Sequence, residues 1–335
     1  MAFYDSLKLE KGMYNGDFNK TLESLDPSEN YEGTGLSGLD AFERQLKRFD
    51  IRVNGKNSDV LEKFFNNSEA SILFPEFVNR AVMQGMENFS VLPSIVATVT
   101  KIDGNDYRTI TSVTDEGATN SVTEGNDLPG TVIKTQANLV TMKKRGRVIS
   151  SSYEALRNKR LDLFAVTLKQ IGAEIARAQL GDAVSVLVSG DGNNNAAGSV
   201  TAVSTTGVAY ADLIALWAGL APHQVNTMLA NAATMQALLA LSEMKDAEAG
   251  LNFQGTGKMI TPLGANLICA PSVADRTIVA FDKNCALEMV DAGGIVVDYD
   301  TLINKQLDRI TISSTVGFAK IFADATKKLT YNAAQ

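Results

Sequence analysis

The sequence has few residues of the kinds that carry catalysis: among 335 residues it holds one histidine, His223, and two cysteines, Cys269 and Cys285. One imidazole, in the loop APHQ, supports neither a Ser/His/Asp triad nor a histidine metal site, which excludes most hydrolase classes. We expect His223 to be solvated. Both cysteines stand in apolar surroundings and should be reduced and buried. Neither has a second cysteine or a histidine near it in the sequence, which argues against a disulfide or a metal site. No catalytic residue, cofactor or metal ion is therefore expected.

Long apolar runs and excess positive charge are also missing. No apolar run approaches the roughly 18 residues of a membrane span, and the N-terminus lacks the basic-then-apolar pattern of a secretory signal. The net charge of −7 argues against a protein that condenses nucleic acid. The glycine-rich stretch at 190–198 follows a helical pattern and contains no lysine, so it is not a phosphate-binding loop.

The most prominent pattern that is present predicts a long helix over 161–188. Ser151 and Glu154 fit a capping box just before it, and Gly190 opens a glycine- and asparagine-rich stretch that ends it. Such a helix is about 40 Å long, which is long for an ordinary domain. Its apolar residues recur at helical spacing, and they are Leu161, Phe164, Leu168, Ile171, Ile175, Ala178, Ala183, Val184, Leu187 and Val188.

Residues 1–70 are polar and rich in glycine, and they predict an extended arm with one docked helix. We expect Ser37 to cap this helix, with Asp40 at the capping-box position. Its narrow apolar stripe consists of Leu39, Phe42, Leu46 and Phe49. A stripe of this width cannot build its own core, so the helix must lie on the body of the same chain or on a neighbouring subunit.

Residues 71–149 change from helical to strand periodicity. Pro75 suits the first turn of a helix that runs to Phe89. Alternating β-branched residues then predict strands, and the turn signal at 103–106 predicts that the first two form a β-hairpin. The ribbon over 95–149 has few bulky apolar residues, and an isolated two-stranded ribbon is marginal in water. Its partner is therefore expected to be another subunit.

The remaining chain predicts helices at 210–220 and 232–241 among short strands, so the fold class is α+β. We expect two separate strands at 285–291 and 293–300. We also expect a closing pair of strands at 306–313 and 316–323.

One cluster of positive charge stands out, and it comprises Lys143, Lys144, Arg145, Arg147 and Arg157. A nucleic-acid patch is one interpretation, although the cluster contains no interleaved aromatic residue beyond Tyr153. We favour ion pairing between subunits, because a symmetric assembly needs complementary patches on one chain. The acidic partners would be Asp115, Glu116, Glu124 and Asp127. The apolar stripe at 39–49 completes the candidate contacts between subunits.

The order of these elements resembles the major capsid proteins of tailed bacteriophages, whose fold is shared by encapsulin shells. The similarity runs from Leu73 to Leu329 and rests on the shared order of several motifs more than on any one of them. The motifs are LFPEFVNRAVMQGMENFSVLPSIVATV (73–99), RVISSSYEALRN (147–158) with the helix to LVSGDG (187–192), ANAATMQALLALSEMKD (230–246), LGANLICAP (263–271), IVAFDKNCALEMVDAGGIVVDYD (278–300) and ITISSTVGFAKIFADATKKLT (310–330).

This resemblance implies the tailed-phage capsid fold and a division of the chain. The implied parts are an N-terminal arm with a docked helix (1–70), a lead-in helix (71–94), an extended β-hairpin loop (95–149), a peripheral domain with a long spine helix (150–200), an axial domain (201–300) and return strands of the peripheral domain (301–335).

The resemblance also implies a structural protein that is not an enzyme. Copies of it would self-assemble into the hexamers and pentamers of an icosahedral shell around phage DNA. The alternative is an encapsulin-type compartment that holds an enzyme cargo. The implied partners are other copies of the chain, a portal, a separate scaffolding protein and a decoration protein, with weak non-specific contact to DNA and no membrane. The implied location is the virion capsid, assembled in the host bacterial cytoplasm.

Overall fold

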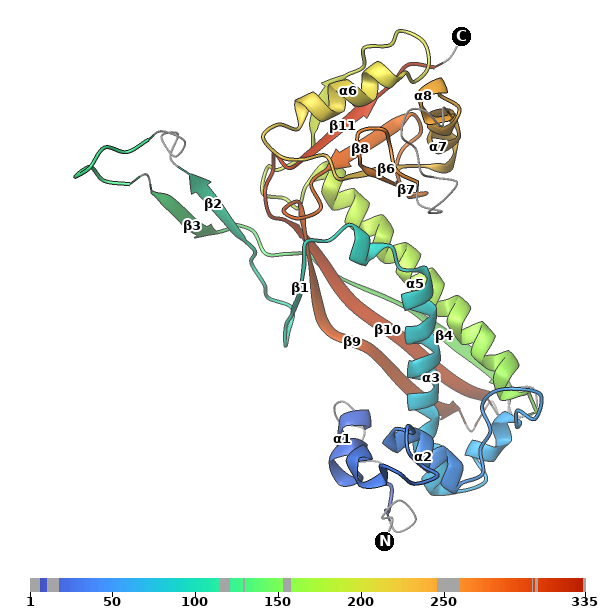
Figure 1. The fold of residues 1–335 in the computed structure, drawn as a ribbon. Helices are drawn as coiled ribbons and strands as arrows, with labels where there is room; N and C mark the ends of the chain where they lie inside the picture. Colours follow the sequence, from blue (N-terminus) through green and yellow to red (C-terminus); the bar gives the residue numbers. More distant parts are fainter. Residues whose placement is uncertain are drawn as a thin grey trace. The chain divides into compact units, whose positions relative to one another are not determined.

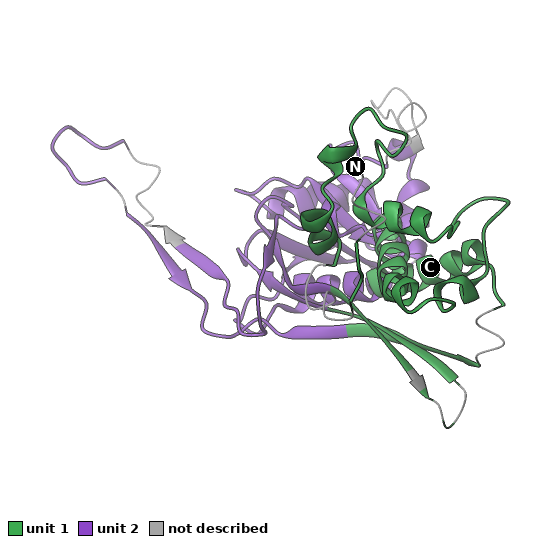
Figure 2. Cartoon of the chain, turned by 90° about the horizontal axis from the view of Figure 1, so that it is seen from below, with its two compact units in different colours: residues 1–89, 145–176, 295–314 green, residues 90–144, 177–294, 315–335 purple. Residues whose placement is uncertain are grey.

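The computed structural model describes residues 7–10, 18–114, 121–128, 130–152, 158–245, 259–302, 304 and 307–333. The chain divides into two compact units (Figure 2). Unit 1 comprises residues 1–89, 145–176 and 295–314, and unit 2 comprises residues 90–144, 177–294 and 315–335. Helices and strands are both present, as the predicted α+β class requires (Figure 1).

The described α-helices are α1 (Phe18–Leu25), α2 (Ala41–Arg48), α3 (Ser68–Phe89), α5 (Leu161–Ser189), α6 (Tyr210–Gly219), α7 (Ala232–Leu239) and α8 (Ser242–Lys245). Short 3-10 turns are η2 (Ser28–Tyr31), η3 (Leu61–Phe64) and η4 (Leu92–Ser94). The described strands are β1 (Thr98–Lys101), β2 (Ile110–Thr114), β3 (Thr131–Thr135), β4 (Met142–Ser152), β5 (Gly198–Thr201), β6 (Thr227–Ala230), β7 (Asn266–Cys269), β8 (Thr277–Phe281), β9 (Leu287–Leu302), β10 (Leu307–Lys320) and β11 (Thr326–Thr330). No helix among these described residues is long and apolar enough to cross a membrane.

The predicted arm helix is present as α2, but Asp40, not Ser37, is its N-cap. The Asp40 carboxylate accepts a hydrogen bond from the Glu43 backbone N–H at 2.8 Å, and the Glu43 carboxylate accepts one from the Asp40 N–H at 3.2 Å. Gly38 has a φ of +84°, so the chain is still turning after Ser37 and the helix begins later than expected. A capping box is therefore present as predicted, but it starts at Asp40, three residues after the predicted Ser37.

Helix α3 starts earlier than predicted, at Ser68, so Pro75 lies inside the helix instead of in its first turn. An internal proline removes one backbone hydrogen bond. Leu73 and Phe74 around it are fully buried in the core of unit 1, and this burial compensates for the missing bond.

The predicted long helix is α5, which runs from Leu161 to Ser189 and belongs to both units. The predicted capping box is wrong, because Ser151 lies in strand β4, while Glu154 lies outside the described residues. Helix α5 instead begins where Arg160 bridges Val60 and where the Leu161 backbone N–H donates to the carbonyl of Asp59 at 2.8 Å. Strand propensity in 142–152 is satisfied by the sheet, which leaves the helix start to tertiary contacts.

The end of α5 is fixed by a buried lysine. Gly190, with a φ of +84°, turns the chain after the last helical residue. The Lys320 ammonium group donates to the carbonyl of Leu187 at 3.1 Å and to that of Asn195 at 2.9 Å, and the Lys320 backbone N–H donates to Asp191 at 2.9 Å. Burial lowers the pKa of Lys320 to about 8. The predicted glycine stop is thus completed by a side chain from β10.

Helices α3 and α5 cross at two glycines within unit 1. A Cβ added at Gly85 would lie 2.2 Å from the carbonyl oxygen of Lys169, and one added at Gly172 would lie 2.2 Å from that of Val82. Neither position has room for a side chain, because the added atom would collide with backbone atoms of the other helix, which cannot rotate away as a side chain can. The two helices therefore pack with their backbones in close approach.

Gly172→Ala is expected to destabilise the protein by about 1–3 kcal/mol, because the new methyl group overpacks the crossing. Helix propensity alone predicts the opposite sign. Gly181→Ala, on the same helix, is the matched control, since its Cβ would meet Ser272 at an ordinary 3.8 Å. That variant should gain about 0.5–1 kcal/mol. Urea unfolding of the two purified variants measures both values, and a stabilised Gly172→Ala would contradict the packing described.

The described strands form three sheets, with orders β1-β9-β10-β4, β5-β11-β8-β6-β7 and β2-β3. The hairpin predicted around residues 103–106 is wrong. Strand β1 pairs in parallel with β9, whereas β2 pairs antiparallel with β3. The turn signal is local, but strand pairing depends on residues nearly 200 positions away, such as Glu288 opposite Thr98.

The pairs of short strands predicted late in the chain are each one long strand. Strand β9 runs without a break from Leu287 to Leu302, through most of the strands predicted at 285–291 and 293–300. Strand β10 runs from Leu307 to Lys320, through most of those predicted at 306–313 and 316–323. Gly293 and Gly294 have φ values of +90° and +71° and bend β9 without ending it. Both long strands lie next to each other in the sheet β1-β9-β10-β4.

Candidate assembly interface

Strands β2 and β3 form a two-stranded ribbon that shares no sheet with the other described strands (Figure 1). Ile110 pairs with Thr135, Ser112 with Ile133, and Val113 with Val132. Because side chains alternate between faces, Ile110 and Ile133 lie on one face of the ribbon and Val132 on the other. Each face of the ribbon therefore carries apolar side chains.

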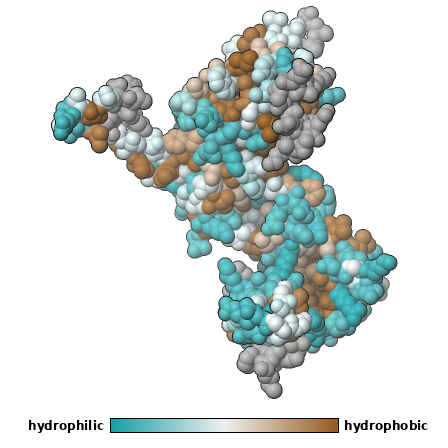
Figure 3. All heavy atoms as spheres, in the orientation of Figure 1, coloured by the Kyte–Doolittle hydropathy of each residue, from teal (hydrophilic) through white to brown (hydrophobic). Residues whose placement is uncertain are grey.

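These apolar side chains are exposed in the single chain. Ile133 is 70% exposed, Ile110 and Val132 are each 55% exposed, and Leu128 in the loop that joins the strands is 81% exposed. Figure 3 shows brown, apolar surface along the ribbon between polar patches. A ribbon of two strands buries too little to be stable alone, and grouped exposed apolar residues mark contact surfaces. The ribbon therefore has the chemistry of a surface that another chain covers.

The base of the ribbon is held to the rest of unit 2 by one buried carboxylate. Glu288 of β9 is 4% exposed and accepts hydrogen bonds from the hydroxyls of Thr100, Tyr107 and Thr109, the second at 2.7 Å. Burial and the Glu288 carboxylate raise the pKa of Tyr107. The Gln136 amide adds a bond at 2.8 Å to the carbonyl of Lys320. Sequence reasoning missed Glu288, because an isolated carboxylate in a strand carries no local signal of its partners.

Four residues of the predicted basic cluster, Lys143, Lys144, Arg145 and Arg147, lie on β4, and the ion pairs of Lys143 and Arg147 are made within the chain. Lys143 contacts Asp182 at 2.9 Å in unit 2, and Arg147 contacts Glu174 at 2.9 Å in unit 1. Lys144 is exposed and Arg145 is partly buried. Both acidic partners are on α5, so these ion pairs join β4 to α5 within the single chain.

The other charged residues predicted to make contacts fall in two places. Glu124 and Asp127 are exposed in the loop of the ribbon. Asp115, Glu116 and Arg157 lie outside the described residues. Pairing between the two charged groups in neighbouring subunits stays a prediction.

The predicted apolar stripe of the arm packs within unit 1. Phe42 and Leu46 are buried in its core, Phe49 is partly buried against the same core, and Leu39 is partly buried. Of the two surfaces on which this helix was expected to lie, the structure uses the body of the same chain. The arm is also tied by the Arg80 guanidinium of α3, which contacts Asp40 at 2.6 Å.

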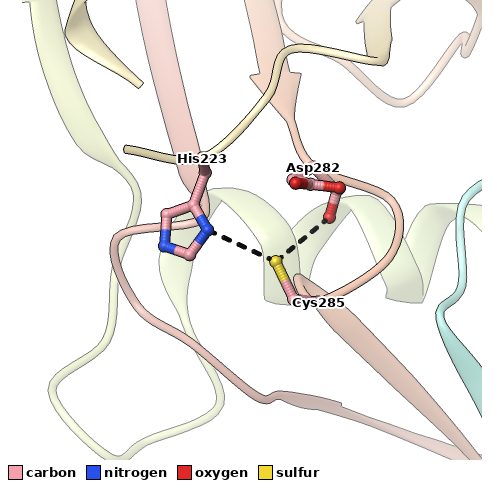
Figure 4. A group of neighbouring side chains, drawn as sticks. All are labelled: His223, Asp282 and Cys285. Atoms are coloured by element: carbon pink, nitrogen blue, oxygen red, sulfur yellow. Dashed lines mark hydrogen bonds between the residues drawn. The ribbon is translucent and has the colours of Figure 1, made fainter. Parts of the chain in front are cut away.

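The two cysteines and His223 differ in exposure from the sequence-based expectation: neither cysteine is fully buried, and His223 is partly buried. Cys269 is exposed, because it ends the edge strand β7. Cys285 is partly buried, and its Sγ lies 3.5 Å from Nδ1 of His223, so a histidine that is distant in the sequence lies beside it in the fold (Figure 4). The loop after α6 and the turn after β8 bring the two side chains together from 62 positions apart. Burial and the carboxylates of Asp282 and Asp324 raise the pKa of Cys285 to about 11.

The chain is similar in sequence and in fold to proteins of phage capsids and encapsulins. A family model described as "Phage capsid protein" matches residues 135–329. No curated protein sequence matches the chain. Three similar solved structures are the capsid of a native GTA particle, the Microbacterium phage Oxtober96 and an encapsulin complex from Synechococcus elongatus, with TM-scores of 0.54, 0.51 and 0.50. Sequence identities are 16%, 12% and 14%, over 75%, 72% and 74% of this chain and 91%, 91% and 92% of those chains.

Proposed function

Since this chain belongs to the family of phage capsid proteins and is a shell-forming structural protein, we propose that its copies assemble into the hexamers and pentamers of an icosahedral capsid around phage DNA. The main support for contact between neighbouring subunits is the β2–β3 ribbon. Its apolar side chains Ile110, Val132 and Ile133 are each more than half exposed in the single chain. Packing them on the adjacent subunit removes them from water and orders the ribbon.

We also propose a role for each part of the chain and a set of partner proteins. Residues 150–200 and 301–335 form the peripheral domain around the spine helix, except that β11 pairs with β8 of the axial segment. Residues 201–300 form the axial domain at the capsomer centre, and residues 95–149 reach the neighbouring subunit. A separate scaffolding protein, a portal and a decoration protein join the assembly, which forms in the host bacterial cytoplasm. The net charge of −7 supports weak, non-specific contact with the packaged DNA.

Ile110→Asp combined with Ile133→Asp is expected to prevent shell assembly while the subunit stays folded. Both side chains are exposed, so charging them costs the isolated fold little. In a contact between subunits the same charges would be buried without partners. Central contacts of this kind are worth about 2 kcal/mol or more each, so the concentration needed for assembly should rise by more than about tenfold. Sedimentation velocity and negative-stain electron microscopy over a concentration series measure this.

Val203→Asp is the control, because Val203 is 61% exposed in unit 2 but lies outside the ribbon. It should assemble like the wild type. If the ribbon double variant formed normal shells at wild-type concentration, the proposed contact would be wrong. If it were unfolded by circular dichroism, the ribbon would belong to the subunit core, which also contradicts the proposal.

The matching phage family model favours DNA as the content over the enzyme cargo of an encapsulin-type compartment. Particles purified from producing cells should contain nuclease-protected DNA. A stoichiometric cargo protein in place of DNA would establish the compartment instead.

A further inference from the structure

A cluster of potential metal ligands lies in unit 2, away from the ribbon. His223 comes from the loop between α6 and β6, and Asp282 and Cys285 come from the turn between β8 and β9. One ligand atom from each of the three residues lies within 4.8 Å of the other two. Figure 4 shows the imidazole and the carboxylate on either side of the Cys285 sulfur.

The spacing of sulfur and nitrogen fits a shared tetrahedral ion. Zinc binds thiolate sulfur at about 2.3 Å and imidazole nitrogen at about 2.0 Å, so two such ligands at a tetrahedral angle lie about 3.5 Å apart. The observed distance from Cys285 Sγ to His223 Nδ1 is 3.5 Å. A ligand oxygen of Asp282 lies within 4.8 Å of both atoms, so it can serve as the third protein ligand and leave a fourth position for water.

The surroundings orient these ligands as metal sites require. His223 directs its other nitrogen, Nε2, toward the Asp324 carboxylate at 3.2 Å. A carboxylate on the second imidazole nitrogen fixes the ring and raises its basicity as a ligand. The Asp282 carboxylate is held by Asn226 Nδ2 at 2.6 Å, by the Asn284 N–H at 3.0 Å and by the Gln224 N–H at 3.2 Å.

We propose that His223, Asp282 and Cys285 bind a divalent ion of the zinc type, oriented by Asp324, which pins the loop after α6 to the turn between β8 and β9. The thiol and imidazole select zinc or cobalt over magnesium and calcium, which take oxygen ligands. Two carboxylates and no lysine or arginine are among the four side chains, so the site attracts a cation. On binding, the Cys285 S–H bond breaks, its electron pair forms the sulfur–metal bond, and the proton leaves to solvent.

Titration of the purified, reduced, full-length chain with Co²⁺ tests this inference. Wild-type protein should show the visible bands of tetrahedral Co²⁺ together with a sulfur-to-cobalt charge-transfer band, and Zn²⁺ should remove both. Cys285→Ser should lose the charge-transfer band and bind far more weakly, as should His223→Gln. Asp324→Asn, whose side chain is largely exposed, should stay folded and bind about 10–100-fold more weakly.

Cys269→Ser is the matched control, because it removes the other cysteine of the chain and should leave the Co²⁺ spectrum unchanged. Absence of the charge-transfer band in wild-type protein would overturn the proposal, whatever the folding of the variants. Its presence in Cys285→Ser, or its loss in Cys269→Ser, would do the same. None of these outcomes depends on whether the chain forms shells.

Discussion

Ile175→Asp is expected to eliminate folded, soluble subunits. Ile175 lies on α5 and is 3% exposed in the core of unit 1. An aspartate there would bury a carboxylate among apolar side chains, at a cost of about 4 kcal/mol or more. That is a large share of the roughly 5–15 kcal/mol by which proteins are stable. The fraction of the expressed chain that stays soluble and the midpoint of urea unfolding both measure the effect.

The same helix supplies its own control. Leu163 and Val166 are each 61% exposed on the outer side of α5. Aspartate at either position introduces the same charge on the same helix without burying it, so the subunits should stay folded. If Ile175→Asp were as soluble and as stable as Leu163→Asp, the assigned buried face of α5 would be wrong.

Arg44→Met is expected to destabilise the arm and unit 1 by about 3–5 kcal/mol, because it leaves a buried carboxylate without its cation. The side chains of Arg44 and Asp26 are both fully buried, and Arg44 Nε lies 2.9 Å from Asp26 Oδ2. The guanidinium also donates to Ser28 Oγ and to the backbone carbonyls of Leu39 and Asp26. Loss of one residue therefore breaks the network that joins α1, η2 and α2.

Arg52→Met is the matched control, since its ion pair with Asp50 is exposed. Exposed pairs contribute less than about 1 kcal/mol, so this variant should unfold at nearly the wild-type urea concentration. Replacing both Arg44 and Asp26 by apolar residues should recover part of the loss, because no unpaired charge remains. Equal unfolding midpoints for Arg44→Met and Arg52→Met would contradict the role of the buried network.

Several features followed from the sequence because they depend on neighbours along the chain. The span of α5 was predicted correctly, since the apolar residues from Leu161 to Val188 repeat at helical spacing and Gly190 ends the helix. The α+β class was predicted correctly for the same reason. The family could be inferred because the order of such local elements is itself distinctive.

Only tertiary structure decided which distant segments meet. Strand β1 does not form the predicted hairpin, because it pairs in parallel with β9. The turn signal at 103–106 depends only on local residues and contains no information about that distant strand. Glu288, Arg44 and the pair of His223 with Cys285 were missed as sites for the same reason. Periodicity records which side of an element is apolar, whereas burial of a charge depends on partners that the fold brings from far along the chain. The amino-acid sequence thus determined the elements, their order and the family, and tertiary packing decided the strand pairing, the buried charges and the exposed ribbon.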